Sequence, residues 1–101
     1  MTAPSPASLQ AFLEDFLYAP AAFLVDESVA LDPQARRIEA RLDTTRSLPL
    51  SDLQRPSPSH PAHVSAADML QVTGSLGCLH AWFFHGCRWG EGWAGFGSRI
   101  H

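Results

Sequence analysis

The stretch that decides the fold class is HVSAADMLQVTGSLGCLHAWFFHG, residues 63–86. Ser65 and Asp68 are spaced as in a capping box, which predicts a helix after Ser65 with the Asp68 carboxylate bonded to the Ser65 amide. From Met69 to Phe84 nearly every residue is apolar or small. A helix that is apolar nearly all round is typical of a buried helix. We therefore expect a long, buried central helix in this half of the chain.

Upstream, the apolar residues follow first a helical and then a strand-like spacing. Ser8 is predicted to cap an amphipathic helix with an apolar stripe at Leu9, Phe12, Leu13, Phe16 and Leu17. Residues 22–31 form an apolar run, and apolar and charged residues alternate over 36–45. Turn residues lie between the two runs, at 31–34. These segments predict an antiparallel hairpin.

The other segments predict a loop and a last strand. Residues 46–62 contain four prolines and several serines, and a loop of this length favours a functional role, with a plain linker as the alternative. Residues 92–100 alternate like a strand that the chain leaves unfinished at His101. We expect one α+β domain over residues 1–101, incomplete at its C-terminus.

Composition argues against several classes of protein. The chain of 101 residues has a net charge of −3 and no lysine, whereas a general nucleic-acid binder needs a basic surface. The weakly polar run from Met69 to Phe84 is shorter than the roughly 18–20 residues of a membrane span. The chain has two cysteines and no basic residue before Arg36, unlike a small secreted domain with its signal peptide. We predict a cytoplasmic protein without nucleic-acid or membrane partners.

The start of the predicted central helix gathers groups that carry chemistry. Free amides at a helix N-terminus can polarise a carbonyl and stabilise an oxyanion. His63, just before the helix, can act as acid or base near neutral pH. Ser65 and Asp68 add a hydroxyl and a carboxylate in the same turn. The alternative is that Ser65 and Asp68 only cap the helix and His63 only seals its end.

The order of these elements resembles the first half of a hot-dog domain, in which a curved antiparallel sheet wraps around a central apolar helix. His63 and Asp68 resemble the histidine and acid of the beta-hydroxyacyl-carrier-protein dehydratases, and Gln71 and Gly74 resemble the glutamine and glycine that follow there. The run from His63 to Leu70 is also similar to the pattern of the FcoT-like long-chain fatty acyl-thioester enzymes. Ser65 stands where that family has an asparagine.

This resemblance implies a substrate that is an acyl-CoA or an acyl-carrier protein, with the thioester carbonyl at the helix N-terminus. The amides near Ala66 and Ala67 would be oxyanion donors, His63 or Asp68 would activate water or shuttle a proton, and Ser65 would position it. The substrate-binding residues would be Ala66, Ala67, Gln71 and Gly74. Hydrolysis, hydration or dehydration and amine addition all stay open.

The resemblance further implies a homodimer or a higher homo-oligomer, and no cofactor. A second hypothesis from a different class is a non-catalytic hot-dog module that serves assembly in a fatty-acid or polyketide pathway. Under the enzyme hypothesis, replacing His63 by alanine abolishes turnover and leaves folding intact.

A cluster of possible metal ligands lies late in the chain, at Cys78, His80, His85 and Cys87. Its spacing does not match a zinc finger, and Cys78 and His80 would point to nearly opposite sides of a helix. We therefore expect no metal site. Cys78 is predicted to be a small core residue, and His80 and His85 to pair with a backbone group or a partner chain.

Overall fold

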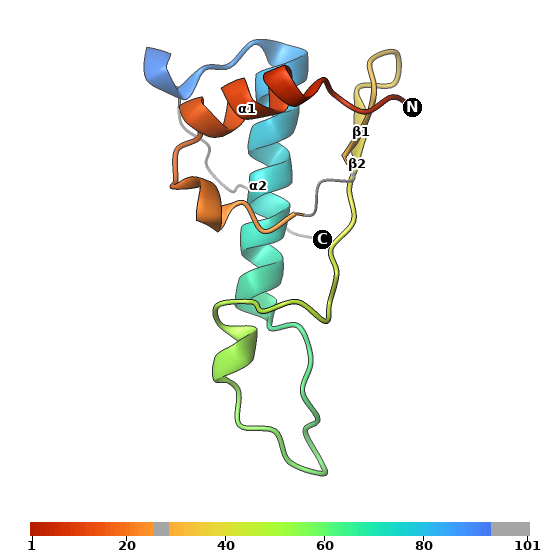
Figure 1. Ribbon diagram of the computed structural model, residues 1–101, viewed down its shortest axis with the longest axis vertical. Coiled ribbons are helices and arrows are strands. Elements are labelled where there is room, and N and C mark those ends of the chain that lie inside the picture. Colours follow the sequence, from red (N-terminus) through yellow and green to blue (C-terminus); the bar gives the residue numbers. More distant parts are fainter. Residues whose placement is uncertain (26–28, 94–101) are drawn as a thin grey trace.

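The computed structural model describes residues 1–25 and 29–93, which form a small α+β structure (Figure 1). Its helices and strands are α1 (Pro6–Asp15), β1 (Ala30–Asp32), β2 (Arg37–Glu39) and α2 (Ala66–His85). Short 3-10 helices lie between and after them, at η1 (Pro20–Ala22), η2 (Ser51–Leu53) and η3 (Trp89–Glu91). The α+β class is confirmed, while the hot-dog arrangement stays a prediction.

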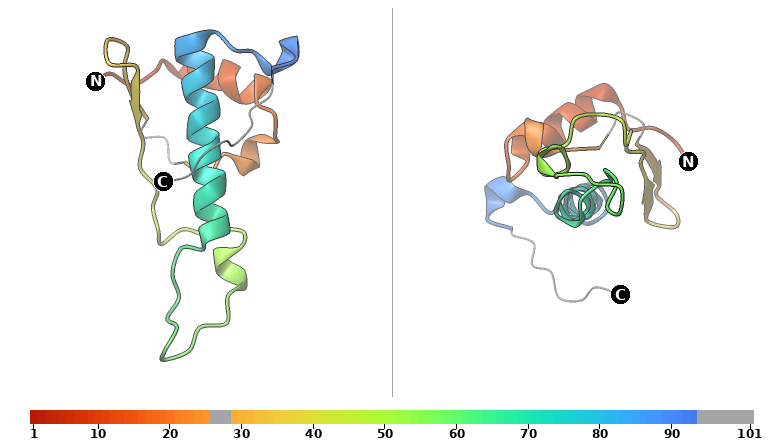
Figure 2. Two further views of the ribbon diagram at one scale, coloured as in Figure 1. Left: turned by 180° about the vertical axis from the view of Figure 1, so that it is seen from behind. Right: turned by 90° about the horizontal axis from the view of Figure 1, so that it is seen from below.

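The long helix α2 begins after Ser65, as the sequence predicts, but it is not buried all round. Its buried residues fall on one face, at Asp68, Val72, Ser75 and Leu79. Met69 and Leu70 are 45% and 58% exposed. Figure 2 gives the reason: seen along α2, the N-terminal segments and the hairpin form an arc around one side of the helix. The expectation of a fully buried helix is therefore wrong.

Gly86 ends α2 in the left-handed conformation, with φ of 66° and its amide bonded to the Ala81 carbonyl. A side chain is disfavoured at this backbone angle by about 1–2 kcal/mol. An added Cβ would otherwise meet open space. We therefore expect Gly86→Ala to lower the free energy of unfolding by about 1 kcal/mol in urea denaturation.

Gly77→Ala is the matched control, because Gly77 lies inside α2 and its added Cβ would also meet open space. Alanine is the better helix former there, so this variant should gain about 0.5–1 kcal/mol. Equal changes in the two variants would contradict the role of the Gly86 backbone angle.

The first helix starts earlier and ends earlier than its apolar stripe suggests. Ser5, not Ser8, is the N-cap, because the Ser8 amide donates to Ser5 Oγ over 3.1 Å. Pro6 then occupies the first helical turn, where its missing amide costs nothing. The helix ends at Asp15, so Leu17 lies beyond it and is 53% exposed.

The predicted hairpin is present but much shorter than the runs 22–31 and 36–45. Each strand has three residues, and Leu31 pairs with Ile38 at the centre. Leu31 is buried, whereas Arg37 and Glu39 lie on the exposed face and form an ion pair. The predicted alternation around Ile38 is thereby confirmed. The rest of the apolar run at 22–25 packs into the core without pairing as a strand.

The proline- and serine-rich loop 46–62 is anchored to the core over its first part. Leu48 is 1% exposed, and the Arg46 guanidinium donates to the Leu24 carbonyl over 3.1 Å. The 3-10 helix η2 follows. These contacts favour a structural or functional loop over a plain linker.

Two remaining expectations concern the end of the chain and the membrane. Within 1–25 and 29–93, no helix is long and apolar enough to cross a membrane. Gly92 ends η3 and does not begin a strand. The rest of the strand predicted at 92–100, from residue 94 on, lies outside the described residues.

Candidate functional site at the start of α2

The first turn of α2 presents two backbone donors to solvent. Ser65 Oγ accepts the Asp68 amide over 3.1 Å, which satisfies one of the free donors of the helix start. Ala66 and Ala67 are exposed, and their amides have no acceptor within the described part of the chain. Such amides, at the positive end of the helix dipole, favour a carbonyl oxygen or an oxyanion.

Asp68 lies in the same turn but faces inward and is 2% exposed. Its carboxylate accepts the amide of Leu50 over 3.1 Å, and the amide and hydroxyl of Ser51 over 2.6 Å each. The Ser65 amide donates to Ser51 Oγ over 2.8 Å instead of to Asp68. The predicted bond between Asp68 and the Ser65 amide is therefore wrong, because the Ser51 hydroxyl stands between the two groups.

These contacts determine the charge of Asp68. Burial raises the pKa of this carboxyl, and hydrogen bonds from Ser51 and Leu50 outweigh that effect, so its pKa lies below the ordinary value of 3.8. Asp68 is consequently ionised at neutral pH and is a poor proton donor there. Its contacts suit it to hold the loop 48–51 on the helix start.

His63 has an exposed ring and an anchored backbone. Its Nδ1 lies 3.0 Å from the Pro61 carbonyl, and its own carbonyl accepts a hydrogen bond from the Gln54 side chain. Gln54 also donates to the Ser51 carbonyl over 3.0 Å. Because a carbonyl only accepts, Nδ1 carries the hydrogen in this contact, and Nε2 of the neutral ring keeps its lone pair. His63 is thus arranged to accept a proton.

Gln71 and Gly74 lie one turn apart on α2 but differ in exposure. The Gln71 amide donates to the Ala22 carbonyl over 3.0 Å and lies 3.4 Å from Ser75 Oγ, so it joins α2 to η1. Gly74 is exposed, and an added Cβ there would meet open space. Of the four predicted substrate-binding residues, Ala66, Ala67 and Gly74 are exposed, whereas Gln71 is half-buried and bonded to η1.

An apolar surface runs along α2 from its first turn. We call it the exposed α2 face, and it comprises Ala66, Met69, Leu70, Thr73, Gly74 and Gly77. These positions recur with the helical spacing of three and four residues, so they share one side of the helix. Leu50, just before η2, and Leu53, its last residue, are also exposed, at 49% and 75%. A chain-like apolar ligand could lie on this face.

The residues considered as metal ligands have other contacts. His80 Nε2 lies 2.7 Å from the Arg36 carbonyl, which confirms a backbone partner for His80. Burial raises the pKa of the half-buried Cys78 thiol, which favours its protonated form. In the part of the chain that the structure describes, no three His, Cys, Asp or Glu side chains are grouped to hold a metal.

Comparison with known proteins gave no match: no family model, no curated protein and no solved structure is similar to this chain. The residues that sequence reasoning missed are Leu50, Ser51 and Gln54, which hold the loop against the helix start. They lie in a segment without periodicity, so no pattern links them to Asp68. From the sequence alone, Ser51 is recognisable only as a further candidate for a helix N-cap.

Proposed function

We propose that this chain binds a fatty acyl thioester, an acyl-CoA or an acyl-carrier protein, in the cytoplasm and hydrolyses or hydrates it. The thioester carbonyl would lie at the first turn of α2, and the acyl chain would follow the exposed α2 face. One observation carries this proposal: the amides of Ala66 and Ala67, which have no acceptor among the described residues, lie where that apolar face begins. A polar acceptor and an apolar tail in one ligand match these two features.

In hydrolysis, His63 Nε2 would take a proton from water as the oxygen attacks the thioester carbon. The carbonyl oxygen would become an oxyanion held by the Ala66 and Ala67 amides. The carbon–sulfur bond would then break, and the imidazolium would return its proton to the leaving thiolate. In hydration of an enoyl thioester, the same histidine would take a proton from the water that adds to the β-carbon and return that proton to the α-carbon. Ser65 and Asp68 would act as positioning residues in either reaction.

We expect His63→Ala to reduce turnover about 10²–10⁴-fold, which is the contribution of a general base. Since the ring is exposed, the melting temperature should be nearly unchanged. Mass spectrometry with saturated and enoyl thioesters would distinguish released thiol from an added water. His60→Ala is the control, because His60 is also exposed and lies just three residues earlier. Equal activity in the two variants would contradict the role of His63.

The alternative function is assembly without catalysis. The exposure of Met69 and Leu70 favours it, because large apolar groups on one surface often mark an interface. In that case the chain would form a homodimer or higher homo-oligomer through the exposed α2 face. Sedimentation would then show oligomers that Leu70→Arg dissociates, and no thioester in the panel would be turned over.

A further inference from the structure

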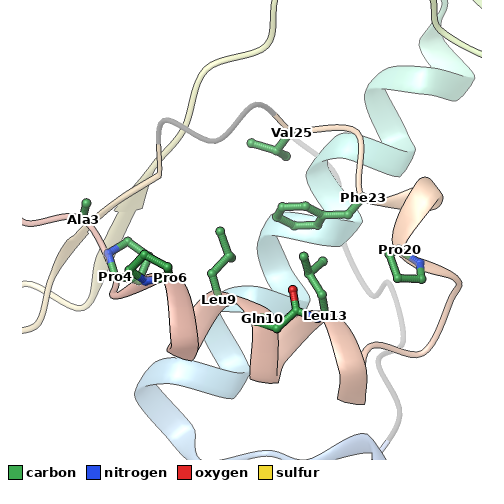
Figure 3. Close-up of a pocket in the computed structure, with 9 residues that line it drawn as sticks. All are labelled: Ala3, Pro4, Pro6, Leu9, Gln10, Leu13, Pro20, Phe23 and Val25. Atoms are coloured by element: carbon green, nitrogen blue, oxygen red, sulfur yellow. The ribbon is translucent and has the colours of Figure 1, made fainter.

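A second apolar site lies away from the start of α2, between α1 and the segment that follows it. It is a groove of about 450 Å³. Figure 3 shows Leu9 and Leu13 pointing from α1 toward Phe23, with Val25 on the far side. Figure 1 shows that α1 crosses the C-terminal part of α2, so this groove is separate from the site around His63.

The lining selects against charged or polar ligands. Among the described residues that line the groove, Gln10 has the one polar side chain, and none is ionisable. The Gln10 amide group already donates to Glu14 over 3.2 Å. A charged group placed inside would lose its hydration without gaining a partner, which is costly. The lining therefore fits a hydrocarbon group best.

The shape of the groove favours a linear occupant. Along α1 it extends from Pro6 to Leu13, a distance of about 10 Å at 1.5 Å per residue. Pro4 and Pro20 lie at its two ends, where proline rings restrict the backbone. Its volume lies within the roughly 300–1,000 Å³ of small-molecule sites.

We infer that this groove binds a single unbranched aliphatic chain whose head group stays in solvent. The site is distinct from the proposed acyl-thioester site, and it needs none of the groups at His63 or Asp68. Apolar contact with Leu9, Leu13 and Phe23 supplies the affinity, so the chain is selected by length and not by its head group.

The test is a titration of the full chain with hexanol, decanol or tetradecanol below the solubility limit of each alcohol. The methyl NMR signals of the protein are recorded at each step. Saturable shifts of the Leu9, Leu13 and Val25 methyl groups, increasing in affinity with chain length, are expected. Gln10→Trp should weaken decanol binding at least tenfold, because an indole at this exposed position would fill the groove. Ala7→Trp, on an exposed part of α1 outside the groove, should change the affinity less than twofold.

Equal effects of the two tryptophan variants, or linear shifts without saturation, would overturn the inference. Shifts restricted to Met69 and Leu70 would also overturn it, and would instead support the acyl site along α2. Loss of thioester turnover in His63→Ala leaves the groove untouched, so the two proposals fail separately.

Discussion

Phe12→Ala should lower the free energy of unfolding by about 3–5 kcal/mol, which is the usual cost of removing a buried phenylalanine ring. Phe12 is fully buried. Its ring centroid lies 5.2 Å from that of Phe16, 5.5 Å from that of Phe23 and 5.9 Å from that of Trp82. One ring therefore joins α1, the segment after η1 and α2, and its loss leaves a cavity between all three.

Urea denaturation followed by tryptophan fluorescence would measure this loss. A domain of this size has a total stability of about 5–15 kcal/mol, so the variant should lose a large fraction of it. Leu17→Ala is the control, since Leu17 lies just beyond the same helix and is 53% exposed. Its change should stay within about 0.5 kcal/mol. A loss below about 1 kcal/mol for Phe12→Ala would mean that the three segments do not share one core.

The helices were the predictable part of this fold, because their signals are local. The stripe that includes Phe12 and Phe16 predicts α1, and the serine at 65 predicts the first residue of α2. The end of α1 was less well predicted, since apolar spacing continues to Leu17 although the helix stops at Asp15. At the end of the helix, the Asp15 carboxylate accepts hydrogen bonds from the amides of Trp89 and Gly90, over 2.9 and 3.0 Å. That contact joins residues 74 and 75 positions apart, and no local pattern carries it.

The covered side of α2 could not be predicted for the same reason. Ser75 and Leu79 are buried, while Met69 and Leu70 are exposed, although hydrophobicity alone would bury the last two before a serine. The segments that contact the helix, such as η1 through Ala22, determine which side of α2 is buried. At the candidate site, the local pattern predicts Ser65 as the cap of α2, and its hydroxyl does accept the Asp68 amide. That pattern does not indicate that the Asp68 carboxylate accepts hydrogen bonds from Leu50 and Ser51, which lie 18 and 17 residues earlier in the chain.

Asp68→Asn should lower the melting temperature by about 5 °C or more, because the hydrogen bonds to this buried carboxylate lose their charge assistance and one donor loses its acceptor. The carboxylate accepts hydrogen bonds from the Leu50 amide and from the amide and hydroxyl of Ser51, and each of these groups can only donate to it. An asparagine amide would place its own NH₂ group against one of these donors and leave it unsatisfied. Glu14→Gln removes the same charge from an exposed residue, so it separates the hydrogen bonds from the change in net charge. Similar losses in the two variants would contradict the anchoring role of Asp68.

The same pair of variants tests the pH dependence that the Asp68 contacts impose. Because the pKa of Asp68 is lowered in the folded state, the carboxylate contributes stability above its ordinary pKa of 3.8. That contribution is lost as the pH falls through the lower, folded-state value. Thermal melts from neutral pH downward should show the melting temperature of the native chain and of Glu14→Gln falling steeply below about pH 4, and that of Asp68→Asn falling less. Parallel curves would mean that the loop at Leu50 and Ser51 is not held by an ionised carboxylate, and the first turn of α2 would lose the support on which the proposed oxyanion donors depend.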